Sequence, residues 1–134
     1  MMSKELLKSL YFDKDADLSL IQAKSVAIIG YGNQGRAQAL NLRDSGVKVI
    51  VGARESGRSE QQAREDGFNV LSTQDAVKNT DIIAILIPDQ VMSEVYDKSI
   101  SPNLSTGKIL QFSHGYNIHY GKIVPPKDID VMMV

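Results

Sequence analysis

Residues 26–35 read Val26-Ala27-Ile28-Ile29-Gly30-Tyr31-Gly32-Asn33-Gln34-Gly35, a short apolar run that leads directly into a G-x-G-x-x-G turn. A helical pattern over residues 36–45 follows at once. In this setting Gly30 permits the tight turn, Gly32 lets the backbone approach a pyrophosphate, and Gly35 lets the helix pack closely on the strand. The free N–H groups and the positive dipole end of the helix then face the anion. Three glycines alone would indicate only a flexible turn, but between a strand and a helix they predict dinucleotide binding.

Composition and charge exclude several classes of protein. The chain has 134 residues, with 15 basic and 16 acidic side chains and a net charge of -1, so no overall field favours nucleic acid or an anionic membrane. Cysteine is absent, which excludes a disulfide framework, a cysteine nucleophile and a thiolate metal site. No signal peptide is recognisable, and no segment approaches the ~20 apolar residues of a membrane span. We therefore expect a cytoplasmic protein without nucleic-acid or membrane partners.

Strand and helix patterns alternate along the chain. Strands are predicted over 25–29, 47–51, 68–71, 81–87 and 108–113, with a sixth from Asp130, and helices over 3–10, 33–45, 59–66, 73–79 and 89–98. Residues 13–22 are predicted to be an irregular lead-in. This alternation favours an α/β fold of the Rossmann type, a doubly wound parallel sheet. Residues 131–134 are still apolar where the chain stops, so we expect a sheet truncated at its last strands, with an exposed edge that a homodimer would cover.

The expected nucleotide follows from the end of the second predicted strand. An NAD site places an Asp or Glu there, whereas a 2′-phosphate requires cationic and hydroxyl donors. This chain carries Arg54, Arg58 and Ser59 in that loop, and all three suit a phosphate. The alternative is a solvated loop in which Glu55 pairs with one of the arginines. We expect NADP(H) rather than NAD.

The candidate catalytic residue is His114, which directly follows the fifth predicted strand. A histidine exchanges protons near neutral pH, and this one is expected at the carboxyl edge of the sheet, where a nicotinamide would reach. Without that placement, a lone loop histidine would be structural or merely exposed, and His119 is interpreted in that way. No metal site is predicted from the carboxylates Asp81, Asp89, Glu94 and Asp97.

Several motifs in collinear order, over nearly the whole chain, resemble the short form of ketol-acid reductoisomerase (acetohydroxyacid isomeroreductase) in its N-terminal, NADP-binding portion. They are residues 11–17 (YFDKDAD), 30–35 (GYGNQG), 39–46 (ALNLRDSG), 87–90 (IPDQ), 114–119 (HGYNIH) and 124–128 (VPPKD). The resemblance implies an NADP-dependent oxidoreductase and isomerase of valine, leucine and isoleucine biosynthesis. With Mg²⁺ it would migrate an alkyl group in a 2-acetohydroxy acid, and with NADPH it would reduce the product to a 2,3-dihydroxy acid.

The resemblance also implies roles for individual residues. His114 matches the active-site histidine of the family. The other matching positions are Tyr31, Gly32, Asn33 and Gln34 for the pyrophosphate, Arg54 and Ser59 for the 2′-phosphate, and Asp89, Gln90, Val91 and Met92 for the adenosine side. Gly57 departs from the family, which usually has a phosphate-binding serine there. That difference would weaken 2′-phosphate binding or shift the contact to Ser56 or Arg58.

In the family, the Mg²⁺ ligands and much of the substrate pocket come from a helical C-terminal domain. Residues 1–134 are therefore interpreted as an incomplete dinucleotide-binding domain without that metal and substrate domain. Because alkyl migration needs a metal Lewis acid, we expect this chain alone to bind cofactor without turning over substrate. Two alternatives stay open: a free-standing NADP-binding module without catalytic activity, and an unrelated NADP-dependent dehydrogenase of the same fold.

Overall fold

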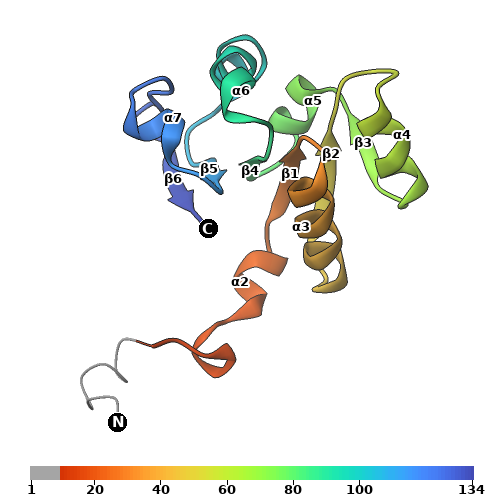
Figure 1. The fold of residues 1–134 in the computed structure, drawn as a ribbon. Helices are drawn as coiled ribbons and strands as arrows, with labels where there is room; N and C mark the ends of the chain where they lie inside the picture. Colours follow the sequence, from red (N-terminus) through yellow and green to blue (C-terminus); the bar gives the residue numbers. More distant parts are fainter. Residues whose placement is uncertain (1–9) are drawn as a thin grey trace.

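The computed structural model describes residues 10–134, and the helix predicted over 3–10 lies almost entirely outside them. Six parallel strands form one sheet in the order β3-β2-β1-β4-β5-β6 (Figure 1). The strands are β1 (Ser25–Ile29), β2 (Lys48–Gly52), β3 (Asn69–Leu71), β4 (Ile82–Ile85), β5 (Ile109–Phe112) and β6 (Asp130–Met133). This order, with its reversal between β1 and β4, is that of a Rossmann-type sheet and confirms the predicted fold class.

Helices cover both faces of the sheet because alternate strand residues point to opposite sides. Ala27 and Ile29 of β1 pack in the cluster that includes α5 (Thr73–Lys78), α6 (Asp89–Val95) and the π-helical turn η2 (Tyr96–Ile100). Val26 and Ile28 pack on the other face, in the cluster that includes α3 (Asn33–Asp44) and α4 (Arg58–Glu65). The central strands β1 and β4 are therefore buried between two apolar layers, whereas the edge strand β6 is largely exposed, as expected for this edge.

Three segments differ from the sequence prediction in kind, whereas the other described elements differ by at most two residues at their ends. Residues 13–22 are not irregular throughout, since they contain the 3-10 turn η1 (Asp13–Asp15) and the short helix α2 (Leu18–Gln22), whose first turn is capped by the side chain of Asp17. The helix predicted over 89–98 stops being α-helical at Val95 and continues as η2 and then η3 (Ser101–Asn103). A four-residue helix, α7 (Tyr116–His119), was not predicted, because one turn is too short to show a helical period.

One cluster of hydrogen bonds ties the glycine turn to the end of α4. The Asp66 carboxylate accepts from the Tyr31 hydroxyl at 2.8 Å and from Nε and Nη2 of Arg36 at 2.7 and 3.0 Å. The hydrogen bond from Arg36, followed by that from Tyr31, lowers the pKa of Asp66 from 3.8 to about 2. Burial, together with the hydrogen bond to Asp66, raises the pKa of Tyr31 to about 12. The buried Tyr31 ring also packs edge-on against Phe68 at 5.8 Å, so this side chain is held against the α3–α4 layer.

Replacing Gly35 with alanine should destabilise the fold. In a helix interior this change normally stabilises by about 1 kcal/mol. Here, however, the new Cβ would lie 2.2 Å from the carbonyl oxygen of Gly30. Relieving such a clash with backbone costs roughly 1–3 kcal/mol, so the net effect should be a loss. Urea unfolding would measure it, with Gly32→Ala as the matched control, because a Cβ at Gly32 meets nothing within 4 Å. Equal stability of G35A and wild type would contradict the packing described.

Replacing Asp66 with asparagine should destabilise the chain at neutral pH and flatten its acid dependence. A carboxylate whose pKa is lowered on folding contributes stability that is complete above its unfolded value, 3.8, and is lost as pH falls through about 2. Because the Arg36 side chain is half exposed, solvent screening keeps the contribution modest. Thermal melts across this pH range, with Asp44→Asn at an exposed ion pair as control, test it. An unchanged acid dependence in D66N would show that other carboxylates dominate.

Candidate functional site

The candidate site lies along the carboxyl ends of the four central strands. Loops that follow β1, β2, β4 and β5 all emerge at this edge because the strands are parallel (Figure 1). They contain, in spatial order, the arginine loop after β2, the glycine turn after β1, the start of α6 after β4 and His114 after β5. The residues predicted from sequence therefore share one edge of the sheet, where ligands bind in folds of this kind.

The glycine turn has the geometry that its sequence predicts. Gly30 has φ 94°, and a Cβ there would lie 2.6 Å from Cγ2 of Ile87 and 2.9 Å from the carbonyl oxygen of Leu86. Gly35 is equally blocked by the carbonyl of Gly30, whereas a Cβ at Gly32 would point into open space. The first helical bond of α3 runs from Arg36 N to Gly32 O at 2.9 Å, so the preceding N–H groups have no intrahelical acceptor. Two glycines of the turn therefore have no room for a side chain, whereas the third, Gly32, borders open space at the helix N-terminus.

Of the four residues assigned to the pyrophosphate, Tyr31 is placed unexpectedly. Its side chain is buried and bonded to Asp66, so only its backbone remains for a ligand at the turn. Gly32, Asn33 and Gln34 are the N-cap and the first two residues of α3, and the two side chains are exposed. Sequence reasoning missed Asp66 and Arg36 because they lie 30 residues apart and neither belongs to a local motif.

The loop between β2 and α4 is shaped by a carboxylate that sequence reasoning also missed. Ser56 adopts φ 57°, an unfavourable conformation for a serine, and its N–H donates to Oε2 of Glu60 at 2.6 Å. Arg64 donates to the other oxygen of Glu60 at 2.8 Å. These hydrogen bonds, Arg64 first, lower the pKa of Glu60. The available signal was a Glu three residues after the helix N-cap, Gly57, which is capping-box spacing.

Arg54 and Arg58 are the cations that the sequence assigns to a 2′-phosphate, and α4 begins at Arg58 rather than at Ser59. Within residues 10–134, neither guanidinium forms an ion pair, and Glu55 does not pair with either of them. The alternative of an internally neutralised loop is therefore not what the structure shows. At Gly57 a side chain would bring its Cβ to 3.1 Å from the carbonyl oxygen of Arg54, a close but not prohibitive contact.

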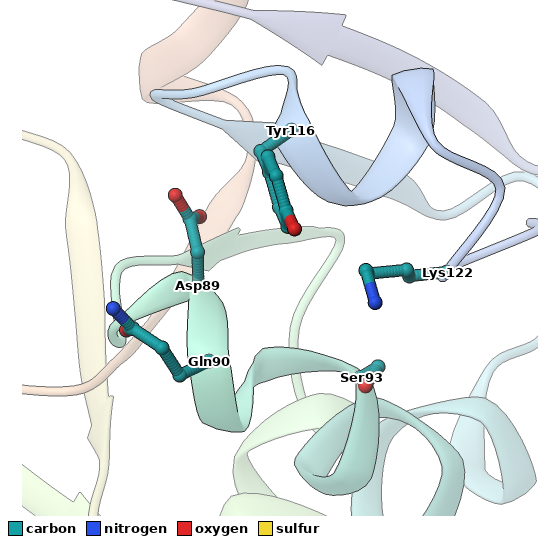
Figure 2. Close-up of a pocket in the computed structure, with 5 residues that line it drawn as sticks. All are labelled: Asp89, Gln90, Ser93, Tyr116 and Lys122. Carbon is teal, nitrogen blue, oxygen red and sulfur yellow. The ribbon is translucent and has the colours of Figure 1, made fainter.

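The segment 89–92 begins α6 and lies between the glycine turn and His114. Met92 is buried in the core, so its side chain is not available to a ligand, whereas Val91 is exposed. Asp89 and Gln90 line a cavity of about 480 Å³, and Figure 2 shows both on α6 with α7 across from them. The cavity is also lined by Ser93, Tyr116 and Lys122. Asp89 also lies next to His114, on the side where the nicotinamide is expected. The assignment of residues 89–92 to the adenosine side of the cofactor stays a prediction.

His114 is largely exposed, and its ring is held from two directions. Nδ1 accepts from the N–H of Tyr116 at 3.2 Å and lies 3.6 Å from Oδ2 of Asp89. The preceding Ser113 hydroxyl accepts from Nε2 of Gln38, on α3, at 3.2 Å, which links the loop to the glycine-turn helix. His119, at the end of α7, instead lies edge-on to the ring of Tyr120 at 4.8 Å. The arrangement leaves Nε2 of His114 without a partner within residues 10–134.

Asn117 is the buried residue that holds α7 against α6. Its side-chain amide donates to the carbonyl of Asp89 at 3.3 Å, and its backbone carbonyl accepts from the N–H groups of Lys122 and Ile123 at 2.9 and 3.0 Å. The buried amide nitrogen of Asn117 thus has acceptors on α6, whereas its Oδ1 is buried without a hydrogen-bond partner within residues 10–134. The helix after β5 therefore fixes the position of the His114 loop relative to the start of α6.

Two findings bear on other classes of ligand. Among residues 10–134, no group of three or more His, Asp and Glu side chains is placed to hold a metal ion. No helix in that same part of the chain is both long and apolar enough to span a membrane.

Comparisons with known proteins agree with the fold and the motifs. Residues 20–134 match the family model described as acetohydroxy acid isomeroreductase, NADPH-binding domain. A ketol-acid reductoisomerase (NADP(+)) of Petrotoga mobilis is 57% identical over 124 residues, which are 92% of this chain and 38% of that protein. The solved structure of an NADH-preferring ketol-acid reductoisomerase from an uncultured archean has a TM-score of 0.88 and 45% identity, covering 90% of this chain and 38% of that one.

A more distant structure shows only the fold. It is a semialdehyde dehydrogenase NAD-binding protein from Cupriavidus necator, with a TM-score of 0.70 and 23% identity over 82% of this chain and 40% of that chain. The chain spans 38% of the length of the two reductoisomerases above. These matches exclude the alternative of an unrelated dehydrogenase. By the family model and by its residues, the chain belongs to the acetohydroxy acid isomeroreductase family, whose NADPH-binding domain it matches over residues 20–134.

Proposed function

We propose that the chain binds NADP(H) across the carboxyl edge of its sheet, with the pyrophosphate at the N-terminus of α3. The observation that carries this proposal is the open face at Gly32. A Cβ at Gly30 or Gly35 would clash with backbone, yet the position between them on the turn meets nothing within 4 Å. An anion there would meet the unbonded N–H groups of a twelve-residue helix and the positive end of its dipole.

The same proposal assigns the 2′-phosphate to Arg54, Arg58 and Ser59. The two guanidinium groups are without ion pairs within residues 10–134, so no existing salt bridge has to break before they bind a phosphate. The carboxylate of Glu60 is already engaged by Ser56 N–H and Arg64, which removes one acceptor for a ribose 2′-hydroxyl. Glu55 is the remaining carboxylate in this loop, and two cations outweigh it. These contacts favour NADPH over NADH, although one relative is NADH-preferring.

We further propose that His114 works beside the nicotinamide in the reaction of a ketol-acid reductoisomerase on 2-acetohydroxy acids, in the synthesis of branched-chain amino acids. Bound NADPH supplies the hydride for the reduction step. His114 follows β5 and is exposed, so it can exchange a proton with a ligand on this edge. The family resemblance adds Mg²⁺, but residues 10–134 do not bring together a set of ligands for this ion.

With Mg²⁺ and NADPH supplied, the 134-residue chain should therefore bind cofactor without converting a 2-acetohydroxy acid. The reason is that alkyl migration requires a metal to polarise the carbonyl, and residues 10–134 offer no cluster of ligands for it. NADPH oxidation followed by absorbance tests this directly. Turnover above background by the purified chain would contradict the expectation.

Arg54→Ala and Arg58→Ala should each weaken NADPH binding by about ten- to a hundredfold, since a hydrogen bond to a charged group contributes about 1.5–3 kcal/mol. NADH lacks the 2′-phosphate, so its affinity should change by less than about twofold. Calorimetric titration of both nucleotides at fixed ionic strength would measure the two effects. Lys98→Ala, which removes a charge from the exposed pair with Glu94, is the control. Equal losses for the two nucleotides would remove the 2′-phosphate assignment.

Gly32→Ala should weaken NADPH and NADH alike, by roughly tenfold, because the pyrophosphate is common to both and the methyl group would occupy its line of approach. The backbone of Gly32 has φ -81° and ψ -160°, which alanine adopts readily, so the fold should be retained. Titration gives the affinities, and urea unfolding confirms that the variant is folded. If G32A binds both nucleotides as tightly as wild type, the pyrophosphate does not lie at this turn.

A further inference from the structure

The ring nitrogen Nδ1 of His114 faces one hydrogen-bond donor and one hydrogen-bond acceptor, which require opposite protonation states of this nitrogen. The N–H of Tyr116, 3.2 Å away, can bond only to an Nδ1 that carries a lone pair. Oδ2 of Asp89, 3.6 Å away, can bond only to an Nδ1 that carries a proton. The two partners therefore serve different protonation states of the same ring.

In the neutral ring, one nitrogen is a donor and the other an acceptor, and the bond at one nitrogen decides which is which. The Tyr116 amide occupies the lone pair of Nδ1, so the proton of the neutral ring lies on Nε2. When the ring becomes charged, both nitrogens carry protons, and the Tyr116 N–H then faces another N–H. The Asp89 carboxylate, with Oδ2 at 3.6 Å from Nδ1, is then the acceptor that faces this nitrogen.

Asp89 is itself held in place for this contact. Its other carboxylate oxygen, Oδ1, lies 3.5 Å from the amide nitrogen of the fully buried Asn117, which also bonds to the Asp89 backbone. The other charged or titratable groups that line the cavity beside Asp89, within residues 10–134, are Lys122 and the Tyr116 phenol (Figure 2). Lys122 does not form an ion pair with Asp89 within residues 10–134, so the carboxylate stays available to the imidazole.

We propose that Asp89 and the Tyr116 amide are positioning groups that keep Nδ1 of His114 engaged in both protonation states, so that Nε2 is the working nitrogen. In its neutral form His114 then presents an Nε2–H hydrogen-bond donor to a ligand on the carboxyl edge. In its charged form the Nε2 proton can pass to a ligand oxygen, which leaves a neutral ring whose remaining proton, on Nδ1, faces the Asp89 carboxylate. The inference rests on the proposed function for the identity of that ligand, a substrate beside the nicotinamide. The contacts that select the nitrogen exist without any ligand.

NMR of the ligand-free, ¹⁵N- and ¹³C-labelled chain tests the inference independently of nucleotide binding. The chain has only two histidines, and His119, whose ring lies against Tyr120, is an internal reference. At pH values where both rings are neutral, His114 should show a single tautomer, with a proton on Nε2 and none on Nδ1. His119 should show a mixture of the two tautomers. As His114 becomes charged, the carboxyl carbon signal of Asp89 should move in step with it.

Asp89→Asn replaces a charged acceptor with a neutral one, so it should weaken the hydrogen bond from Nδ1 of the charged ring and leave the neutral form, with its Tyr116 bond, unchanged. Asp44→Asn, the same chemical change at an exposed ion pair in the last turn of α3, should alter neither. A neutral His114 with the same mixture of tautomers as His119, or an Asp89 carboxyl that does not respond to its protonation, overturns the proposal. Both observations are made on the wild-type chain, so they decide it even if D89N does not fold. A failure to bind NADPH would leave these results intact and would overturn the proposed function instead.

Discussion

The positions of the other loops at the carboxyl edge of the sheet depend on the contact between the start of α3 and the turn after β1. Gly35 lies so close to the carbonyl of Gly30 that a single Cβ would approach it to 2.2 Å. This closeness brings the helix N-terminus over the end of β1 and leaves Gly32 exposed between two crowded neighbours. Because Gly30 is in turn packed against Leu86 and Ile87, the loop between β4 and α6 is held by the same contact. The proposed anion site and the His114 side of the edge therefore depend on one close backbone contact.

A second constraint keeps the turn in register with the arginine loop. Asp66 at the end of α4 holds both Tyr31 of the turn and Arg36 of α3, while Glu60 in the first turn of α4 holds the backbone of Ser56. The two carboxylates are therefore used for structure, and the two arginines of the loop remain free of ion pairs within residues 10–134. A nearly neutral chain therefore has, among its described residues, two unpaired arginine side chains in one loop, as the proposed 2′-phosphate site requires.

The parts of the fold that follow from local pattern could be predicted from the sequence. The individual strands and helices, the glycine turn and the Ser72 cap of α5, whose hydroxyl accepts from Asp75 N at 3.1 Å, all depend on neighbours within a few residues. The contact of Asp66 with Arg36 and that of Asp89 with His114 could not be predicted in this way. Each joins residues far apart in the chain, and the partners become neighbours only when the crossovers bring strand ends together. For the same reason, the burial of Tyr31 could not be anticipated from its place in a phosphate-binding motif.

The most direct test of the account is an NADPH titration of the labelled chain followed by backbone amide NMR. A dinucleotide that lies across the carboxyl edge should shift the amides of residues 32–34, 54–59, 89–90 and 113–115, and leave those at the opposite edge, such as residues 44–47, unchanged. Saturable shifts confined to those four loops are the predicted result. Binding that leaves residues 32–34 unperturbed would contradict the claim that the open glycine of the turn is where the cofactor is held.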